Sequence, residues 1–249
     1  MIRVILFLLV GLSSFTSPKA SFKKAQLKYA RVKAAYELKE KTVQELYKKQ
    51  DLNLKSSTIF IRVFKQENEL ELWAKSLNSK SFKKVKTFSI CAKSGTIGPK
   101  VRAGDGQVPE GLYYVDRFNP ASNYHLSLGI NYPNKADKIR AGFYPTGGDI
   151  FIHGECVTIG CIPLTNEYIK ELYIACVEAK EANQKNIKVE IYPCKLNKVN
   201  TEKIMKQYHN DKERIKLWKV LQKSFDYFEN KHIPASYSFD QHGNYMINQ

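Results

Sequence analysis

A histidine and a cysteine lie eight positions apart in residues 147–165, which read GGDIFIHGECVTIGCIPLT. A cysteine is nucleophilic as its thiolate, and a nearby imidazole can take its proton near neutral pH. Gly160, directly before Cys161, allows close backbone approach and can aim N–H groups at a developing oxyanion. Because Thr165 suits a helix N-cap, Cys161 is expected in a loop just before a helix. The stretch therefore predicts covalent catalysis by Cys161, with His153 as its base.

Metal binding is the alternative interpretation of the same residues. His153, Cys156 and Cys161 could ligate zinc, with His125 as a fourth ligand. Their spacing matches no common zinc pattern, which argues against a zinc site. Covalent catalysis by a thiol needs neither a metal ion nor an organic cofactor, so we expect none.

The cysteine count also bears on the chemistry. The chain has five cysteines, and in an oxidising compartment an odd number leaves at least one thiol free, as a nucleophile requires. The other four can pair in three ways, or they can be small buried free thiols. These four are Cys91, Cys156, Cys176 and Cys194. Their pairing stays open at the level of sequence.

Four strings carry a resemblance to a known family. They are HG-x3-T-x-GC (residues 153–161), SGTIGPK (94–100), GDGQVPEGLY (104–113) and FNPASNYHLSLGINYPN (118–134). Together they resemble the L,D-transpeptidase (YkuD-type) catalytic domain family, in the murein L,D-transpeptidase-like branch with a short loop between histidine and cysteine. The resemblance covers about residues 58–195.

The resemblance implies a role for individual residues. Cys161 would be the acylated nucleophile, His153 its base, and Gly154 the residue whose backbone carbonyl orients the imidazole. The YHLS segment would lie beside the active site, which makes Tyr124 and His125 candidate substrate contacts. Because a histidine within a strand is more often structural than catalytic, His125 is not assigned a catalytic role.

The sequence departs from the usual family signature at two positions. The family commonly has a second histidine two residues before the cysteine and an Arg or Asn two residues after it. Here these positions are Ile159 and Pro163. The thiolate of Cys161 thus has a single imidazole partner in the motif, and position 163 offers no side chain to hold a substrate carboxylate.

Hydrophobic patterning predicts the elements that position this motif. Strands are expected at residues 58–65 and 70–75, which form a hairpin, and at 82–92, 111–118, 123–130 and 186–192, the last closing the sheet. Long helices are expected at residues 21–50, 165–183 and 201–229, and the tail from 232 should be a short surface strand or coil. One face of the third strand would carry Val85, Thr87, Ser89 and Cys91, and the first helix would bury Leu27, Ala30, Ala34 and Leu38.

Two loops of this scheme carry basic residues. Residues 95–106 are rich in glycine and hold Arg102, so we expect them to form a substrate rim. They lack a GxxxxGK[ST] sequence, which argues against a phosphate cradle. Residues 131–145 have the composition of a mobile lid, in which Arg140 could meet a carboxylate of a peptide stem.

The chain divides into four predicted parts. Residues 1–20 form a signal peptide, 21–56 an N-terminal helical segment, 57–195 the catalytic domain, and 196–249 a C-terminal helical extension and tail. The fold class is mainly β with α (α+β), and the resemblance implies a β-sandwich catalytic domain between N- and C-terminal helices.

The N-terminus predicts export. A basic start is followed by an apolar run at residues 4–12 and small polar residues at 13–17, which is the pattern of a secretory signal peptide. A buried N-terminal helix is the alternative. The apolar run is too short to span a bilayer, and no later segment could do so. We therefore expect a protein of the periplasm or cell envelope, without a stable membrane span after cleavage.

Charge and motif together predict the partner. The formal net charge is +16, and it falls to +14 when Arg3 and Lys19 leave with the signal peptide. Such charge suits peptidoglycan, whose stems carry free carboxylates. Nucleic acid is not expected, because no recognition motif appears and the export signal points away from it. A lysine-rich surface without any partner is the remaining interpretation of the charge.

Three functions are compatible with the sequence. In the first, Cys161 forms a thioester with a peptidoglycan stem and an amine resolves it, which is L,D-transpeptidation. In the second, water resolves the thioester, so that the enzyme is an L,D-carboxypeptidase or an amidase that releases a wall-attached protein. The third is a non-catalytic peptidoglycan-binding module, against which the intact HG and GC pairs argue.

Overall fold

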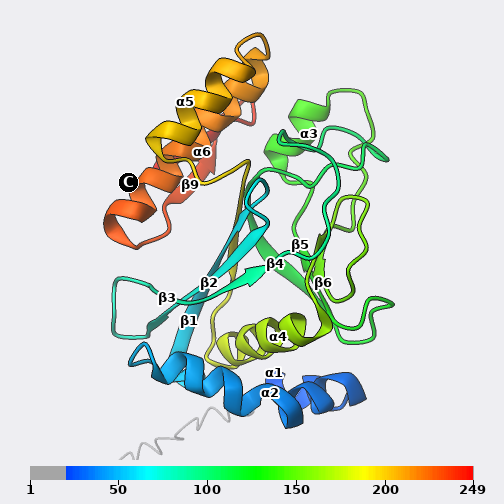
Figure 1. The fold of residues 1–249 in the computed structure, drawn as a ribbon, viewed down its shortest axis with the longest axis vertical. Coiled ribbons are helices and arrows are strands. Elements are labelled where there is room, and N and C mark those ends of the chain that lie inside the picture. Colours follow the sequence, from blue (N-terminus) through cyan, green and yellow to red (C-terminus); the bar gives the residue numbers. More distant parts are fainter. Residues whose placement is uncertain (1–20, 249) are drawn as a thin grey trace, which may run out of the picture.

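The centre of the protein is a curled β-sheet with helices on both of its faces, as seen in a computed structural model (Figure 1). The structure describes residues 21–248, so the signal peptide predicted for residues 1–20 lies outside the described residues. No helix between residues 21 and 248 is long and apolar enough to cross a membrane. The mainly β, α+β class predicted from the sequence is confirmed.

Eight of the described strands pair into this sheet. They are β1 (Ser57–Phe64), β2 (Glu69–Ser76), β3 (Lys83–Ser89), β4 (Gly111–Asn119), β5 (Ser127–Ile130), β6 (Phe151–His153), β7 (Ile162–Pro163) and β8 (Lys188–Tyr192). Their order across the sheet is β3-β2-β1-β8-β4-β5-β6-β7. The strand that was expected to close the sheet, β8, therefore lies in its middle, parallel to β1 and antiparallel to β4.

The first half of the sheet confirms the predicted hairpin, because β1 and β2 pair antiparallel. The third strand is shorter than predicted and contains a bulge. Lys86 pairs with Leu72 and Lys84 with Trp73, which leaves Val85 without a partner. A bulge shifts the alternation of side chains. Val85 and Phe88, three residues apart, are consequently both buried, and the predicted single face does not hold.

The second half of the sheet carries the candidate motif. Strand β4 joins the two halves, since residues 111–114 pair with β8 and residues 115–119 pair with β5. The predicted strand at 123–130 begins only at Ser127. His125 lies in the preceding loop with a φ of +66°, so the prediction that it belongs to a strand is wrong.

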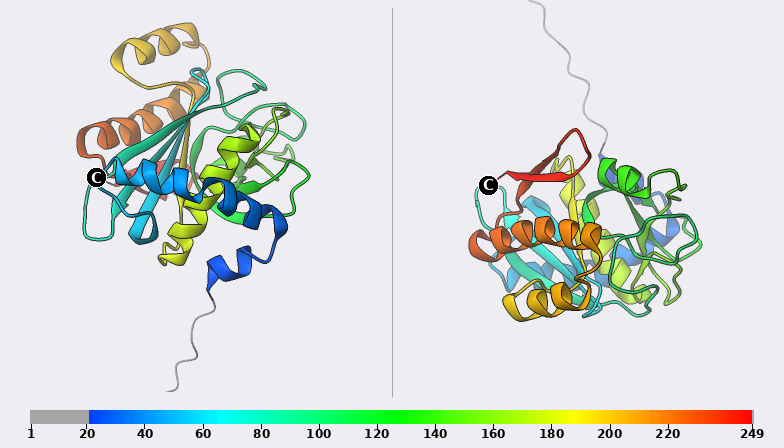
Figure 2. Two further views of the ribbon diagram at one scale, coloured as in Figure 1. Left: turned by 60° about the horizontal axis from the view of Figure 1, so that its bottom comes forward. Right: turned by 90° about the horizontal axis from the view of Figure 1, so that it is seen from above.

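One face of the sheet is covered by helices from the centre and the start of the chain (Figure 2). Helix α4 (Asn166–Glu181) begins after Thr165, whose side chain accepts a hydrogen bond from the Tyr168 N–H, as an N-cap does. The apolar stripe predicted for α4 is fully buried. Its members are Ile169, Leu172, Tyr173, Cys176 and Val177.

The N-terminal helices pack on α4. The single helix predicted for residues 21–50 is two helices, α1 (Phe22–Gln26) and α2 (Ala30–Lys48), with a break between them. The buried side chains of α2 include Val32, Ala35 and Tyr36, whereas Leu38 is 63% exposed. The predicted apolar stripe was therefore wrong in register. A single turn of 3₁₀ helix (Leu54–Ser56) leads from here into β1.

The other face of the sheet is covered by the C-terminal extension, which Figure 1 shows as the yellow to red elements. The helix predicted for residues 201–229 is two helices, α5 (Lys198–Gln207) and α6 (Lys212–Lys231). Asp211 caps α6 by accepting a hydrogen bond from the Arg214 N–H. Trp218 of the same helix is fully buried. The tail forms a hairpin of β9 (Ser236–Phe239) and β10 (Tyr245–Asn248).

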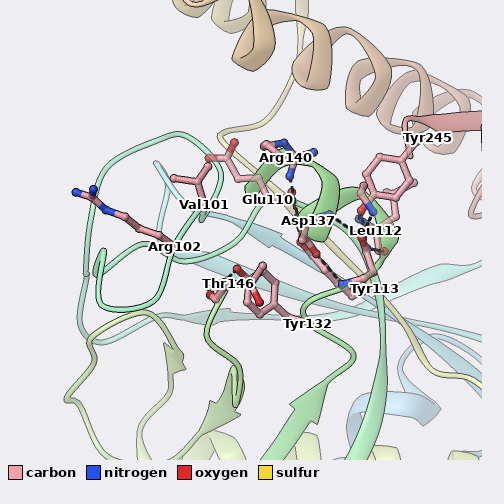
Figure 3. A network of polar contacts seen from close by, with 12 residues as sticks. Val101, Arg102, Glu110, Leu112, Tyr113, Tyr132, Asp137, Arg140, Thr146 and Tyr245 are labelled. Carbon is pink, nitrogen blue, oxygen red and sulfur yellow. Dashed lines mark hydrogen bonds and ion pairs between the residues drawn. The ribbon is translucent and has the colours of Figure 1, made fainter. Parts of the chain in front are cut away.

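The segment predicted to be a lid contains a helix instead, α3 (Lys135–Ala141). The Asn134 side chain and the Asp137 carboxylate form a reciprocal capping box. Two hydrogen bonds anchor α3. Asp137 accepts from the Tyr113 hydroxyl at 3.0 Å (Figure 3). Asn134 donates to the Tyr245 hydroxyl at 2.7 Å. The helix is thus tied to β4 and to the tail.

Candidate active site

Pairing of β6 with β7 brings the two motif residues to neighbouring strand ends. Strands β6 and β7 are parallel, with Ile152 opposite Ile162, and both isoleucines are buried. Side chains alternate along a strand, and directly paired residues share a face. His153 follows Ile152 in β6 and so lies on the opposite face, whereas Cys161 lies directly before β7 and contacts Phe151, two residues before His153.

His153 is held in one tautomer by its neighbour. Its Nδ1 lies 2.5 Å from the backbone carbonyl oxygen of Gly154, and because a carbonyl can only accept, Nδ1 carries the proton. The lone pair is then on Nε2, which is the arrangement a general base needs. Burial lowers the pKa of His153, against the opposing effects of the Gly154 hydrogen bond and Glu155. The imidazole, 2% exposed, is therefore neutral at pH 7.

Cys161 is a free cysteine beside Phe151. The Phe151 N–H donates to its sulfur at 3.4 Å, and the thiol donates to the Asp149 carbonyl at 3.7 Å. Burial raises the pKa of the Cys161 thiol, and the Phe151 hydrogen bond only partly offsets this. In the described part of the chain no hydrogen bond joins Cys161 to His153. A neutral thiol beside a neutral imidazole is thus favoured over a preformed ion pair.

Position 154 requires a glycine because neighbouring residues pack closely against its backbone. A Cβ on this residue would lie 2.6 Å from Asn166 Oδ1, 2.9 Å from His125 Cβ and 3.0 Å from the Tyr124 carbonyl oxygen. Asn166 also accepts a hydrogen bond from the Glu155 N–H at 3.0 Å. The start of α4 and the 124–125 loop therefore fix the backbone whose carbonyl orients His153.

Gly160 is required by its conformation, with a φ of +136°. A Cβ there would also lie 3.1 Å from the Gln107 carbonyl oxygen. The Gly160 N–H, which was predicted to point at an oxyanion, donates instead to the Thr158 hydroxyl at 3.2 Å. Thr158 in turn donates to the Cys161 carbonyl at 2.9 Å, so this threonine holds the loop closed around the cysteine.

A disulfide joins Cys91 to Cys156. It connects the segment after β3 to the loop between His153 and Cys161, and Cys176 and Cys194 are buried free thiols. Cys156 is therefore not available as a thiolate ligand for the zinc site that was considered from the sequence. Among residues 21–248 no group of three or more His, Cys, Asp or Glu side chains is arranged to hold a metal ion.

Two cavities flank the glycine-rich segment. The smaller, about 200 Å³, is lined by Cys161 and by residues 92–97, and we term it the thiol cavity. The larger, about 880 Å³, is lined by Arg102 and Arg140 together with residues of α6 and the tail, and we term it the charged cavity. Gln107 lines the charged cavity while its backbone carbonyl backs Gly160.

The predicted substrate contacts fall into two groups. Tyr124 stacks on His153, with ring centroids 4.8 Å apart, and His125 packs against Gly154. Arg102 and Arg140 lie together around the charged cavity and do not line the thiol cavity. Figure 3 shows Arg102 extending outward from its loop, whereas Arg140 faces Asp137.

Sequence reasoning missed three residues that shape the site. Thr158 stood in the HG-x3-T-x-GC string without an assigned role, although its fixed place in that string was a signal. Asn166 and Gln107 act through packing and hydrogen bonds with residues distant in sequence. No local pattern could have revealed those two.

Comparison with known proteins identifies the family of the chain. The L,D-transpeptidase catalytic domain (YkuD) family matches residues 59–191. The chain is also 34% identical over 209 residues, which are 83% of this chain and 79% of the relative, to "Putative L,D-transpeptidase YafK" of Escherichia coli K12, and equally to its counterpart in Escherichia coli O157:H7. The chain therefore belongs to the L,D-transpeptidase (YkuD) family.

Solved structures overlap with it more loosely. The helical cell shape determining protein Pgp2 from Campylobacter jejuni superposes with a TM-score of 0.45 at 19% identity, covering 74% of this chain and 73% of that one. Bd1075 of Bdellovibrio bacteriovorus gives a TM-score of 0.40 at 18% identity, covering 74% and 79%. These superpositions are too loose to carry a functional argument.

Proposed function

We propose that this protein is an exported cysteine acyltransferase that forms a thioester between Cys161 and a peptidoglycan stem, and that acts as an L,D-transpeptidase. The observation that carries the proposal is the neutral His153, whose Nδ1–H is held by the Gly154 carbonyl, at the end of β6, while the free thiol of Cys161 contacts Phe151 of the same strand. Family membership supports the substrate class.

In the acylation step, His153 Nε2 acts as a general base. The thiol must first turn from the Asp149 carbonyl, its resting acceptor, toward this nitrogen. The sulfur then attacks a stem carbonyl carbon as its proton passes to His153, and the carbonyl electron pair moves to oxygen. When the tetrahedral intermediate collapses, the C–N bond breaks and the imidazolium gives its proton to the leaving amine.

The oxyanion needs N–H donors during this step. Because the Gly160 N–H is bonded to Thr158, we assign the principal role to the Cys161 N–H. In the second step an amine attacks the thioester, His153 takes the amine proton, and the sulfur leaves as thiolate and recovers that proton. If water attacks instead, the same residues release the stem by hydrolysis, and the runner-up activity of carboxypeptidase or amidase results.

The decisive experiment incubates the purified protein with a disaccharide-tetrapeptide, with and without a second stem as amine acceptor, and resolves the products by mass. We expect a thioester adduct on the wild type, a cross-linked product with the acceptor, and neither in Cys161→Ala. Circular dichroism should show that the variant is folded. Turnover by folded Cys161→Ala, or a wild type that neither binds covalently nor turns over, would contradict the proposal.

Export is a separate part of the proposal. It depends on the n-, h- and c-region pattern of residues 1–21. A fusion of these residues to a reporter that is active only outside the cytoplasm should give a signal, and removal of residues 4–12 should abolish it. A reporter that stays inside the cell with the intact leader would place peptidoglycan out of reach.

A further inference from the structure

The charged cavity is a built feature of this chain that the thioester mechanism does not use. Its walls come from four separate segments: the loop around Arg102, helix α3 with Arg140, helix α6 with Lys216, and the turn between β9 and β10 with His242. The last two belong to the C-terminal extension. The matched family domain ends at residue 191, so this cavity forms only where the extension docks on the catalytic domain.

The extension is held firmly against α3. A Cβ on Gly243 in the hairpin turn would lie 2.2 Å from Ile139 Cδ1, so the turn fits against the helix at a residue without a side chain. The Tyr245 hydroxyl, two residues further on, accepts a hydrogen bond from Asn134 at 2.7 Å. The cavity is therefore walled by ordered elements, and its apolar floor is completed by Leu217 and Val220.

The acidic residues around the cavity are mostly engaged within the protein. Asp105 accepts hydrogen bonds from the Lys100 ammonium and from three backbone N–H groups. Asp211 caps α6 and pairs with the Arg214 guanidinium at 3.1 Å. Of the acids that line the cavity, Glu213 alone makes no hydrogen bond or ion pair through its side chain within residues 21–248.

Two basic groups, in contrast, are uncommitted. The Arg102 guanidinium and the Lys216 ammonium have no hydrogen bond or ion pair with any residue that the structure describes, although both line the cavity. Arg140 pairs with the buried Asp137 at 3.2 Å and also lines the cavity. The uncommitted charge of the lining, two cations and Glu213, is thus net positive, and the apolar floor lies beside it, which suits an apolar peptide with free carboxylates.

The two cavities share a wall. Gln107 lines the charged cavity, and its side-chain oxygen accepts from the N–H of Thr96, which lines the thiol cavity. Its backbone carbonyl lies against Gly160, next to Cys161. A chain acylated on Cys161 could therefore continue past Gln107 into the charged cavity, or a neighbouring chain could lie there.

We propose that the charged cavity binds a second peptide stem of peptidoglycan through its free carboxylates, with Arg102 and Lys216 as the principal contacts. This proposal rests on the function proposed above, because it takes the same polymer as ligand. It adds a second site, formed with the C-terminal extension, that holds a stem which is not the one acylated by Cys161.

The test separates this site from the thiol. Cys161 is first blocked with a small alkylating agent, and binding of a disaccharide-tetrapeptide to the blocked protein is measured by calorimetry. We expect saturable binding that weakens as salt rises, because the contacts are ionic. The same ligand with its carboxylates converted to amides should bind at least tenfold more weakly.

Charge variants then locate the binding. The double variant Arg102→Glu/Lys216→Glu should weaken binding at least tenfold, and Glu213→Gln should strengthen it a few-fold by removing the uncommitted acid. Lys223→Glu, an exposed change two turns further along α6 and outside the cavity lining, is the matched control and should bind like the wild type. The Arg102 backbone contacts to Asp105 do not involve its side chain, so the loop should keep its shape.

Two results would overturn the proposal: no binding by the blocked protein, or equal losses in the double variant and in Lys223→Glu. Neither result depends on turnover by the unblocked enzyme, which tests the proposed function by itself. Binding without turnover would instead leave the second site standing and contradict the acyltransferase.

Discussion

The two cavities on either side of residues 95–107 differ in how the chain builds them. The thiol cavity is formed within the matched family domain and is lined by Cys161, which a short loop joins to His153 at the end of β6. The charged cavity is about four times larger and combines that domain with α6 and the tail hairpin. We infer that the first cavity carries the reaction and the second the recognition.

The two cavities also treat charge in opposite ways. At the reacting groups burial disfavours the charged forms, since it lowers the pKa of His153 and raises that of Cys161, which lines the thiol cavity. In the charged cavity Arg102 and Lys216 are left without partners in the described chain. If this division is correct, substitutions around Cys161 should act on turnover, and substitutions around α3 should act on binding and stability.

The largest effect on turnover after loss of the nucleophile should come from His153→Gln. Removal of a general base typically costs about 10²- to 10⁴-fold in rate. In the wild type, kcat/KM should rise with pH through the pKa of His153, which burial places below its ordinary 6.5. The rate should therefore still be high at pH 6.5. The glutamine variant should lose this acid limb, and a limb that persists in the variant would show that His153 is not the base.

Alkylation of Cys161 by a small electrophile tests the same pair in the absence of substrate. The motif alone predicts reactivity well below the ordinary pKa of a thiol, because an imidazolium would stabilise the thiolate. The structure favours a neutral pair, so the rate of alkylation should rise only at or above pH 9, in His153→Gln as in the wild type. If the wild type reacts near pH 6 and the variant does not, Cys161 and His153 form a thiolate–imidazolium ion pair.

A smaller effect on turnover is expected from Gly154→Ala. The added methyl group would meet Asn166, His125 and the Tyr124 backbone at 2.6–3.0 Å, so the backbone must shift. Overpacking of this kind costs about 1–3 kcal/mol. Because the shifted carbonyl also orients His153, we expect turnover to fall about 10- to 100-fold. Gly148→Ala, where a Cβ meets no atom within 4 Å, is the control and should change neither the stability nor the turnover. Equal effects would contradict the positioning role of Gly154.

These predictions concern residues of which only some could be found in the sequence. Cys161, His153 and Gly154 stand in one contiguous string, and the strand before it and the helix cap at Thr165 are local patterns, so they could be predicted. Asn166 and Gln107 contact the motif only through the folded chain. The disulfide between Cys91 and Cys156 joins residues 65 apart, which no spacing rule could have selected.

The errors in the fold have similar causes. Two breaks, one between α1 and α2 and one between α5 and α6, interrupt stretches that are helical in composition. Neither break contains Gly or Pro. Packing against α4 decides the first break and is not visible as a local pattern. The second break is set by Asp211, an N-cap residue whose type is a local helix-start signal that the sequence prediction did not use. Helix α3 was missed because Pro, Asn and Gly around it suggested a loop, although Asn134 and Asp137 form a capping box that the sequence did contain.

Removal of the disulfide should affect stability more than turnover. A bond that closes a loop of this length stabilises a protein by about 2–4 kcal/mol. Cys91→Ala/Cys156→Ala should lower the free energy of unfolding by this amount, measured in urea, and lower turnover several-fold because the loop before Cys161 is freed. Cys156→Ala alone should behave like the double variant. A loss of activity as complete as that of Cys161→Ala would instead give Cys156 a chemical role.

The smallest effect on turnover is expected at the anchor of α3, where the change should appear in stability as a function of pH. Burial raises the pKa of Asp137 to about 6 from an ordinary 3.8, against the opposing effect of Arg140. The folded state thus binds a proton more tightly than the unfolded state, so the contribution of Asp137 is fully present below about pH 4. It is lost as pH rises through 6.

The free energy of unfolding of the wild type, measured relative to that of Asp137→Asn, should therefore fall by about 1–3 kcal/mol between pH 4 and pH 7, since one pKa unit corresponds to about 1.4 kcal/mol. Tyr113→Phe removes a hydrogen bond that lowers the pKa of Asp137, so it should move this loss to higher pH. Turnover of a small stem should stay near the wild-type value in all three proteins. A stability difference that rises with pH would show that the Arg140 pair outweighs burial, and a parallel loss of turnover would break the division between the two cavities.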